Sequence, residues 1–449
     1  MNFKSKFLQE FQARGFFAAC THPQELDEIL NKESITAYIG FDCTAKSLHA
    51  GSLIQIMILR MLQKHGHKPL ILLGGGTTKI GDPSGKDEAR KVLSENDISN
   101  NLNGIRKTLE KFISFEGENA AEMVNNNDWL KNLNYLEFLR DIGRHFSINR
   151  MLTFDSVKLR LEREQPLSFL EFNYMILQAY DFYYLSNFFL NKKYTCILQI
   201  GGSDQWGNIV NGVELARRKY SETTNIAEDG AETSGPDLKE PIIPTFGLTS
   251  PLLTTSDGKK MGKTSDGAVW LDSEMLPAFD YFQYFRNIHD ADVGKFLKLF
   301  TDLSLDEIEV LVPGSSCLGG SSERVSGVME VHQINKAKEI LAFEATKICH
   351  GEKAASDSLQ KAREIFVAKN SAAFEEKEVF LGDEKSKKLV DIIFEINAAE
   401  SKGAAKKLIE GKAVKINGEA ILDIHHTISN FGEFELSVGK KKFFKILVK

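Results

Sequence analysis

The chain has 449 residues, 42% of them hydrophobic and 26% charged, and a net charge of −6, which favours about two to four globular domains. Its five cysteines are dispersed, with no CxxC pair and no Cys/His spacing that suits zinc, so a disulfide framework is excluded and a reducing compartment is expected. No apolar run approaches the roughly 20 residues of a membrane span and no signal peptide is evident, so we expect a cytoplasmic protein without a membrane partner.

Short strand-like runs alternate with helical patterns over the first 220 residues. Residues 36–41 and 69–73 have the pattern of strands, and residues 53–64 between them that of a helix with a broad apolar face. A further strand-like run, residues 194–200, is followed by two glycines and a helical pattern. This alternation predicts an α/β domain with a mostly parallel sheet, whose ligands bind at the carboxyl ends of the strands.

The later segments differ in composition. Residues 221–240 are polar and acidic, which predicts a solvated loop or insertion, whereas the pattern after residue 276 is almost purely helical. In the tail, residues 401–410 have a helical pattern, and the Asn-Gly pair at residues 417–418 predicts a β-hairpin. Residues 385–449 hold thirteen Lys against eight Asp or Glu, and this basic end of an acidic chain suggests that an anionic polymer is bound there.

The most informative stretch is residues 38–53. A strand is followed by a polar loop and then by His-Ala-Gly-Ser at residues 49–52, which opens a helix. A helix N-terminus offers free N–H groups and the positive end of the dipole, so it binds phosphate well. Alone, this stretch is equally compatible with an ordinary turn that carries a surface histidine.

A second stretch, residues 257–264, has the sequence Asp-Gly-Lys-Lys-Met-Gly-Lys-Thr. Lys260 and Lys263 are three residues apart and can clamp phosphates on which charge develops. Residues 81–86 lack the Walker spacing, which disfavours a P-loop NTPase. Together, the two stretches resemble the HIGH and KMSKS motifs of class I aminoacyl-tRNA synthetases.

Three further segments, residues 74–86, 171–181 and 199–208, resemble the tyrosyl-tRNA synthetase family and occur in the order of that family. The resemblance runs from the first helix to the tail. Physical reasoning supports a shared site, because positions 174, 178 and 181 fall on one face of a helix. Neighbouring aromatic residues favour a pocket wall over a solvated stripe.

The resemblance implies an α/β fold with a Rossmann-like parallel-sheet catalytic domain, followed by a helical anticodon-side domain and a small α+β RNA-binding domain. The expected boundaries are residues 1–247 for the catalytic domain with a connective insertion, 248–276 for the KMSKS-type loop and linker, 277–352 for the helical domain, 353–384 for a linker, and 385–449 for the RNA-binding domain of ribosomal-protein type.

The resemblance also implies a tyrosine–tRNA ligase. Such an enzyme activates L-tyrosine with ATP to tyrosyl-adenylate plus pyrophosphate, and then transfers tyrosine to the 3′-terminal adenosine of tRNA(Tyr). No catalytic base is required for activation, because the tyrosine carboxylate is already an anion, so catalysis is positioning plus charge stabilisation. We expect Mg²⁺ to accompany the substrate ATP, no protein-bound metal, a homodimer, and no DNA partner.

The resemblance implies the residues of the site as well. Tyr38 and Asp181 recognise the phenolic hydroxyl, which can both donate and accept a hydrogen bond. The other tyrosine-binding residues are Asp82, Tyr174 and Gln178 at the α-ammonium group, with Gln199 and Gln205 orienting the substrate. The ATP-binding residues are Asp42, His49, Gly51, Ser52, Asp204 and Lys263. The catalytic residues, which contact the triphosphate or the departing pyrophosphate, are Thr44, His49, Lys86, Arg90, Lys260, Lys263 and Thr264.

Two positions depart from the family pattern. Ser52 stands where a second histidine is frequent, and Ile39 where a small polar residue is frequent, so we expect altered ATP contacts with catalysis retained.

Three alternatives remain. A tryptophanyl synthetase is disfavoured by Tyr38 with Asp181, because an indole N–H offers no acceptor. A nucleotidyltransferase of the same superfamily would lack the helical domain and the tail. A non-catalytic RNA-binding or splicing protein on the same scaffold is disfavoured by the intact phosphate-binding lysines.

Overall fold

The structure is a computed structural model. It describes residues 1–83, 93–191, 193–228, 244–256, 258, 261–264, 267–315, 331–372, 374–381, 386–417, 419–429, 432–439 and 442–449. The chain forms two compact units, Met1–Ser358 and Leu359–Lys449. None of the helices in these ranges combines the length and the apolarity that a membrane crossing requires.

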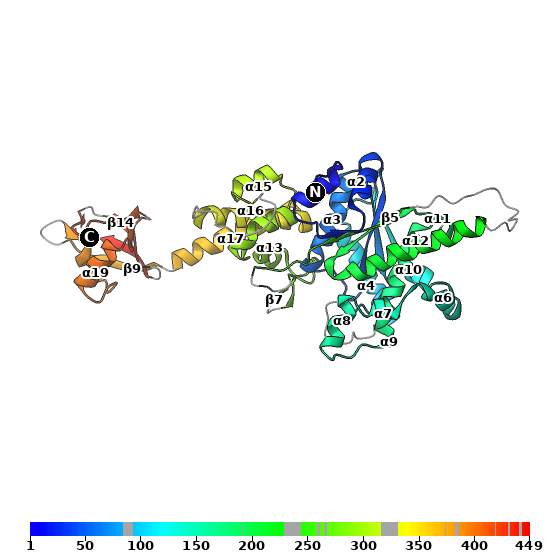
Figure 1. Cartoon of the computed structure of the whole chain (residues 1–449). Coiled ribbons are helices and arrows are strands. Elements are labelled where there is room, and N and C mark those ends of the chain that lie inside the picture. The colour runs from blue at the N-terminus through cyan, green and yellow to red at the C-terminus, as the bar shows by residue number, and fades with distance from the viewer. Residues whose placement is uncertain are drawn as a thin grey trace. The chain divides into compact units, whose positions relative to one another are not determined.

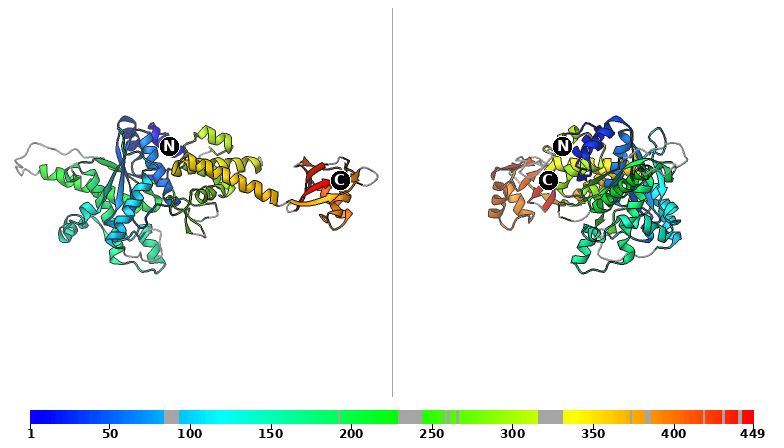
Figure 2. Two further views of the ribbon diagram at one scale, coloured as in Figure 1. Left: turned by 180° about the vertical axis from the view of Figure 1, so that it is seen from behind. Right: turned by 45° about the vertical axis from the view of Figure 1, so that its right-hand side comes forward.

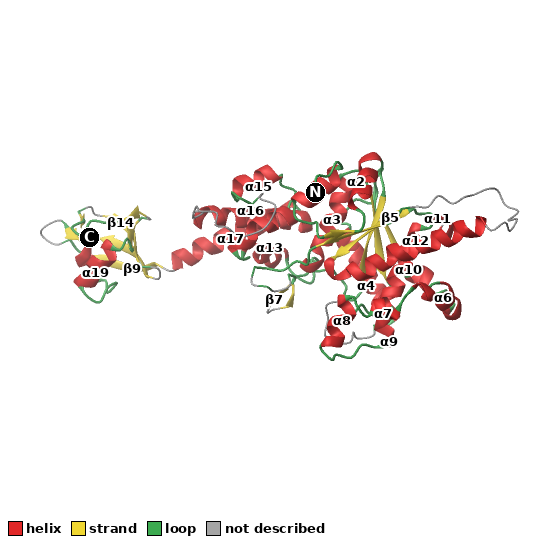
Figure 3. Ribbon diagram, viewed as in Figure 1, coloured by secondary structure: helices red, strands yellow, loops and turns green. Residues whose placement is uncertain are grey.

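A six-stranded sheet with the order β1-β6-β5-β2-β3-β4 forms the centre of the first unit (Figures 1 and 3). Neighbouring strands from β6 to β4 are parallel, and only β1 is antiparallel. The strands are β1 (Ala19–Cys20), β2 (Thr36–Asp42), β3 (Lys68–Gly74), β4 (Glu122–Asn125), β5 (Cys196–Gly202) and β6 (Phe246–Ser250). The predicted α/β fold with a mostly parallel sheet is therefore confirmed.

Helices make the crossovers that parallel strands require. They are α3 (Leu53–Lys64) between β2 and β3, α4 (Glu95–Leu109) between β3 and β4, and α12 (Trp206–Glu228) between β5 and β6. The strands β3 and β4 lie on one side of β2, and β5 and β6 lie on the other. The order of the sheet thus reverses between β2 and β5, and ligands of such sheets bind at the carboxyl ends of the strands at this point.

The segment between β4 and β5 is helical. Its helices are α5 (Asn127–Leu130), α6 (Tyr135–Asp141), α7 (Ile148–Met151), α8 (Asp155–Glu162), α9 (Phe169–Phe172), α10 (Tyr174–Ser186) and α11 (Phe188–Asn191). Helices α10 and α12 pack against each other (Figures 1 and 2). Because α12 extends to Glu228, the prediction of a loop over residues 221–240 is wrong for its first eight residues. The remainder of that range lies outside the described residues.

Further helices complete the first unit. They are α1 (Lys6–Ala13), α2 (Pro23–Lys32), α13 (Ala278–Arg286), α14 (Val293–Phe300), α15 (Leu305–Leu311) and α16 (Val331–His350), and α17 (Glu352–Ala372) contains the boundary between the units. The helical pattern expected after residue 276 is therefore observed. The guanidinium of Arg14, just after α1, donates to the carbonyl oxygens of Lys298 and Thr301 at 3.0 and 3.3 Å. It also donates to the Leu303 carbonyl at 2.9 Å. These bonds join the N-terminal helix to the end of α14.

The second unit has a five-stranded sheet with the order β12-β11-β14-β15-β9 and a separate pair, β10 with β13. Its strands are β9 (Phe374–Val379), β10 (Lys387–Lys388), β11 (Val414–Ile416), β12 (Glu419–Ala420), β13 (Thr427–Ile428), β14 (Gly432–Val438) and β15 (Lys442–Val448). Its helices are α18 (Leu389–Glu395) and α19 (Lys402–Glu410), both of which contribute to the buried core.

The structure of this unit agrees with two predictions made for the tail. Helix α19 matches the predicted residues 401–410, with the Ser401 hydroxyl accepting from the Ala404 N–H as its N-cap. The antiparallel pair β11 and β12 matches the predicted hairpin, and Asn417 has a φ of 48°. Strand β9 pairs in parallel with β15, so the sheet of this unit begins before residue 385, within the segment expected to be a linker.

Candidate active site

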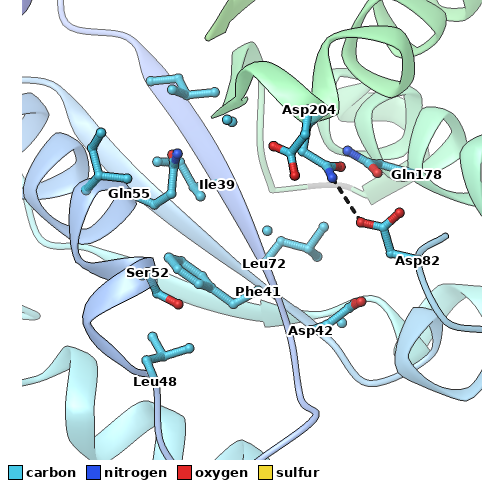
Figure 4. Close-up of a pocket in the computed structure, with 18 of the residues that line it drawn as sticks. Ile39, Phe41, Asp42, Leu48, Ser52, Gln55, Leu72, Asp82, Gln178 and Asp204 are labelled. Atoms are coloured by element: carbon cyan, nitrogen blue, oxygen red, sulfur yellow. Dashed lines mark hydrogen bonds between the residues drawn. The ribbon is translucent and has the colours of Figure 1, made fainter. Parts of the chain in front are cut away.

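A cavity of about 390 Å³ lies at the carboxyl ends of β2 and β5 (Figure 4). It occupies the position where the order of the sheet reverses, as expected for this topology. The predicted site residues that line it are Tyr38, Asp42, Thr44, His49, Gly51, Ser52, Asp82, Tyr174, Gln178, Asp181, Gln199, Asp204 and Gln205. Segments that are far apart in the sequence therefore converge on one pocket.

The structure does not describe the side chains of five predicted site residues. Lys263 and Thr264 form the short strand β7, which pairs with β8 (Gly267–Ala268), but only their backbone is described. Lys86, Arg90 and Lys260 lie outside the described residues.

The first phosphate motif has the expected form of a helix start. His49 precedes the short 3-10 helix Ala50–Ser52, which leads into α3, and its Nδ1 accepts from the Gly51 N–H at 3.0 Å. A Cβ atom on Gly51 would lie 2.7 Å from the His49 ring and 3.0 Å from the Met261 carbonyl oxygen. Glycine is therefore required for this close approach.

The second phosphate motif reaches the first one directly. Gly262 has a φ of +99°, and a Cβ there would lie 2.5 Å from the Gly51 nitrogen. The following segment pairs with the first motif, since the Ala50 N–H donates to the Val269 carbonyl at 2.7 Å. Next to it, Trp270 packs edge-on against His49 at 6.1 Å between ring centroids. The two motifs thus meet backbone to backbone at the edge of the cavity.

A buried carboxylate lies at the inner end of the cavity. Asp181, on α10, is 1% exposed and accepts from Asn126 Nδ2 at 2.9 Å and from Trp129 Nε1 at 2.8 Å. Burial raises the pKa of Asp181 to about 7, although these two hydrogen bonds lower it, and the nearby Asp42 adds to the increase. This carboxyl group is therefore close to half-ionised near neutral pH.

Tyr38, on β2, faces the same cavity. Its side chain is 1% exposed, and its hydroxyl has no hydrogen-bond partner within the described ranges. Burial raises the pKa of Tyr38 well above its usual value, and the charge of Asp181 acts in the same direction. A buried hydroxyl without a partner is costly, so this group is suited to receive a polar ligand.

Hydrogen bonds link several of the polar side chains at the cavity. Gln205 donates to Asp82 at 2.9 Å, the bond drawn in Figure 4, and Asn208 donates to Gln178 at 2.9 Å. Figure 4 shows Asp82, Gln178 and Asp204 on one side of the cavity and Ser52 on the other. The Tyr174 hydroxyl donates to Asp42 at 3.2 Å. These hydrogen bonds fix the positions of carboxylate and amide oxygens that can accept hydrogen bonds from a ligand in the cavity.

Sequence reasoning missed Asn126 and Trp129, which follow β4 and hold Asp181. Asn126 is fully buried, and its Oδ1 accepts from the Gly76 N–H at 2.8 Å while its Nδ2 also donates to the Thr77 hydroxyl at 3.0 Å. It thereby ties the glycine-rich turn after β3 to the carboxylate on α10. No local pattern could pair these residues, because the contacts depend on the order of the strands.

Comparison with known proteins identifies the family to which this fold belongs. Residues 30–367 match the family model described as class I tRNA synthetases (W and Y), and residues 371–446 match the tyrosine–tRNA ligase SYY-like C-terminal domain. The chain belongs to the tyrosyl-tRNA synthetase family. The synthetase is 52% identical over 459 residues to a tyrosine–tRNA ligase of Ehrlichia ruminantium (strain Welgevonden), an alignment that covers 100% of this chain and 99% of the relative.

Other relatives agree with this assignment. The synthetase is 51% identical over 460 residues to the tyrosine–tRNA ligase of Wolbachia pipientis subsp. Culex pipiens (strain wPip), covering 100% of this chain and 99% of the relative. Among solved structures, it resembles a C-terminally truncated mitochondrial tyrosyl-tRNA synthetase of Aspergillus nidulans, with a TM-score of 0.65 and 28% identity. That match covers 81% of this chain and 95% of the other. The family matched by residues 30–367 includes tryptophan enzymes, but the C-terminal domain and these relatives all favour tyrosine.

Proposed function

We propose that this enzyme activates L-tyrosine with ATP to tyrosyl-adenylate and pyrophosphate, and transfers tyrosine to the 3′-terminal adenosine of tRNA(Tyr). The observation that carries the proposal is the juxtaposition of Tyr38 and Asp181 in a cavity at whose edge the two phosphate motifs meet. The first feature suits a phenol, and the second suits a triphosphate. Both substrates of the first reaction therefore have a place in one pocket.

The phenolic hydroxyl of tyrosine suits the inner end of the cavity. A phenol donates to a carboxylate and accepts from another hydroxyl, and Asp181 and Tyr38 offer these two groups. Phenylalanine would bury the Tyr38 hydroxyl without a partner, at a cost of about 1–3 kcal/mol, and would leave Asp181 with only its bonds from Asn126 and Trp129. An indole N–H would satisfy only the carboxylate. The pocket thus favours tyrosine over both competitors.

The α-ammonium group of tyrosine belongs, in this proposal, beside Asp82, Tyr174 and Gln178, with Gln199 and Gln205 orienting the substrate. A cation in a partly dry pocket needs a carboxylate and neutral acceptors around it. Gln205 already bonds to Asp82, so this carboxylate is oriented before the substrate arrives.

ATP belongs at the outer end of the cavity. Thr44, His49 and Gly51 would contact the triphosphate, and Asp204 the ribose hydroxyls. Asp42, Ser52 and Lys263 complete the proposed ATP site, and Lys86, Arg90, Lys260 and Thr264 are proposed to act with Lys263 on the departing pyrophosphate. Mg²⁺ would arrive with the phosphates, whose oxygens are its usual ligands; no group of three His, Cys, Asp or Glu side chains in the described part of the chain is arranged to hold a metal ion.

The chemical step needs no protein base. The tyrosine carboxylate attacks the α-phosphorus in line, the bond to the pyrophosphate breaks, and charge accumulates on the leaving oxygens. The N–H groups at the start of the helix and the lysines of the second motif would stabilise that charge. In the second step, the adenosine hydroxyl attacks the adenylate and AMP leaves.

The second unit is proposed to bind tRNA. Its helix α19 and the following hairpin carry the exposed lysines Lys406, Lys407, Lys412 and Lys415, whereas Lys402 pairs with Asp391 at 2.6 Å. Exposed lysines suit contacts with phosphate. For the anticodon-side domain we propose the expected limits of residues 277–352, and we extend the RNA-binding domain, expected over residues 385–449, to include β9, because this strand pairs with β15.

We also propose a homodimer that forms through the helices between β4 and β5. Large apolar side chains are exposed there, including Leu136 (75%), Phe169 (70%) and Ile148 (63%). Large apolar side chains exposed to solvent are found at association sites. A molar mass near twice the 50.4 kDa of one chain, measured by light scattering, is expected, and Leu136→Glu should give the single-chain mass. Leu422→Glu, at an exposed leucine of the second unit, is the matched control. A single-chain mass for the unaltered protein contradicts the proposal.

The function is tested by exchange of labelled pyrophosphate into ATP. Exchange should require tyrosine and should be far slower with phenylalanine or tryptophan at the same concentration. Aminoacylation of tRNA(Tyr) should follow with the full chain. Absence of tyrosine-dependent exchange, or equal exchange with tryptophan, would overturn the proposal.

A further inference from the structure

The loop that leads into the second phosphate motif is attached to the helical segment that follows the catalytic domain. The Ser256 N–H and hydroxyl both donate to Oδ2 of Asp292, at 2.9 and 3.0 Å. Asp292 immediately precedes α14 and is only 4% exposed. A buried carboxylate is costly unless it is hydrogen-bonded, so these two bonds stabilise Asp292 in its buried position.

A second contact holds the other side of the same loop. The hydroxyl of Tyr284, on α13, lies against the backbone of Gly262. Burial raises the pKa of Tyr284 to about 12, and the charge of Asp292 contributes to this increase. Tyr284, on α13, and Asp292, which precedes α14, are both on the helical segment, and we call them the anchoring pair.

The loop is closed between these two anchors. The Met261 N–H donates to the Leu253 carbonyl at 3.0 Å and so joins the two ends of the loop. Lys295, on α14, adds a bond from its ammonium group to the Thr254 carbonyl at 3.0 Å. Gly262 at the far end touches the backbone of Gly51. The backbone at Gly262, which leads into Lys263, is thus held from the helical segment on one side and from the first motif on the other.

We propose that Asp292 and Tyr284 are positioning residues that hold Ser256 and Gly262 so that the second phosphate motif meets the departing pyrophosphate. Neither side chain lines the cavity. The inference rests on the proposed function, because it assigns Asp292 and Tyr284 an effect on the chemical step of that reaction. Misplacement of a catalytic group by about 1 Å can cost on the order of 100-fold in rate, so weakening the anchors should lower kcat and leave tyrosine binding unchanged.

The test uses the full-length protein and the pyrophosphate exchange assay. Asp292→Ala should lower kcat by about 10- to 100-fold and leave the tyrosine dissociation constant, measured by equilibrium dialysis, within about twofold. Asp292→Asn keeps an acceptor for Ser256 and should retain most of the rate. Asp290→Ala is the matched control, since Asp290 pairs with Lys338 on α16 instead of with the loop.

Two further variants separate positioning from folding. Tyr284→Phe removes only the hydroxyl that meets Gly262 and should lower kcat by about threefold to tenfold, so it carries the test if Asp292→Ala fails to fold. In a Lys263→Ala background, Asp292→Ala should have little additional effect, because the group that it positions is already absent.

The outcomes are distinct. Unaltered protein without tyrosine-dependent exchange overturns the proposed function before any variant is compared. An active parent with undiminished kcat in both Asp292→Ala and Tyr284→Phe overturns the positioning role alone. The same conclusion follows if tyrosine affinity falls as much as kcat, or if the effects of Asp292→Ala and Lys263→Ala multiply fully. A loss confined to kcat, with recovery in Asp292→Asn, supports the inference.

Discussion

The ionisation of Asp181 should control tyrosine binding, and Trp129→Phe is a selective way to perturb it. This substitution removes the indole N–H that donates to Asp181 at 2.8 Å. It retains an aromatic ring that can stack on Tyr184, where the present rings are 4.5 Å apart. The remaining bond from Asn126 is untouched, so the change isolates one donor to the carboxylate.

The direction and size of the effect follow from the pKa of Asp181, which burial raises to about 7. The substrate phenol donates to the ionised carboxylate, so affinity for tyrosine should rise with pH through about 7 and level off above it. A hydrogen bond to a charged group contributes about 1.5–3 kcal/mol, which corresponds to about one to two pKa units at 1.36 kcal/mol each. Trp129→Phe should therefore move the midpoint to about 8 or 9 and weaken binding at pH 7 about 5- to 50-fold.

Equilibrium dialysis with labelled tyrosine from pH 5.5 to 9 measures this profile. Asn132→Ala, which removes an exposed amide close to Trp129 in the chain, should leave the midpoint unchanged. Affinity that does not vary with pH in the parent, or a loss in Trp129→Phe that is equal at every pH, would refute the reasoning, because either result means that ionisation of Asp181 does not govern binding.

Three further predictions concern other parts of the chain. Gly262→Ala should reduce pyrophosphate exchange at least tenfold with tyrosine affinity retained, because its Cβ would meet the Gly51 nitrogen at 2.5 Å and glycine alone tolerates this φ readily; an unchanged exchange rate would contradict it. Arg14→Ala should lower the free energy of unfolding by about 2–4 kcal/mol, measured by urea denaturation, whereas the exposed Lys32→Ala should change it by less than about 0.5 kcal/mol. Lys406→Glu should weaken tRNA binding and flatten its salt dependence without altering exchange, and a filter-binding titration that matches the parent would exclude a contact there.

Local sequence patterns predicted helices and strands well where a run of buried residues is bounded by a cap or a turn. The strands β2 and β3 appeared as apolar runs because both faces of a parallel sheet are covered, and α19 was framed by its Ser401 cap. The end of α12 was not predicted, because residues 221–228 are polar. The helix continues into them from its preceding turns, without the apolar face by which a sequence pattern reveals a helix. Composition alone cannot distinguish such an extension from a loop.

The site was predicted in part, and the division has a physical basis. Residues such as Asp181 and His49 belong to motifs whose spacing is visible along the chain. Asn126 and Trp129 belong to no such motif. They contact Asp181 only because β4 lies beside β3, which brings the residues that follow β4 to α10. The anchoring pair of Tyr284 and Asp292 was invisible for the same reason. Contacts across the fold depend on strand order and helix packing, which no short window of sequence contains.

The amide of Asn126 has a consequence for the evolution and redesign of amino-acid specificity. One side chain serves both the glycine-rich turn after β3 and the carboxylate of Asp181. Replacing Asp181 by an apolar residue, to admit a substrate without a hydroxyl, would leave one N–H of Asn126 and the partly buried indole N–H of Trp129 without their acceptor, at about 1–3 kcal/mol each. Productive changes of specificity should therefore arise as combined substitutions at positions 126, 129 and 181, and libraries that vary position 181 alone should yield mostly unstable proteins.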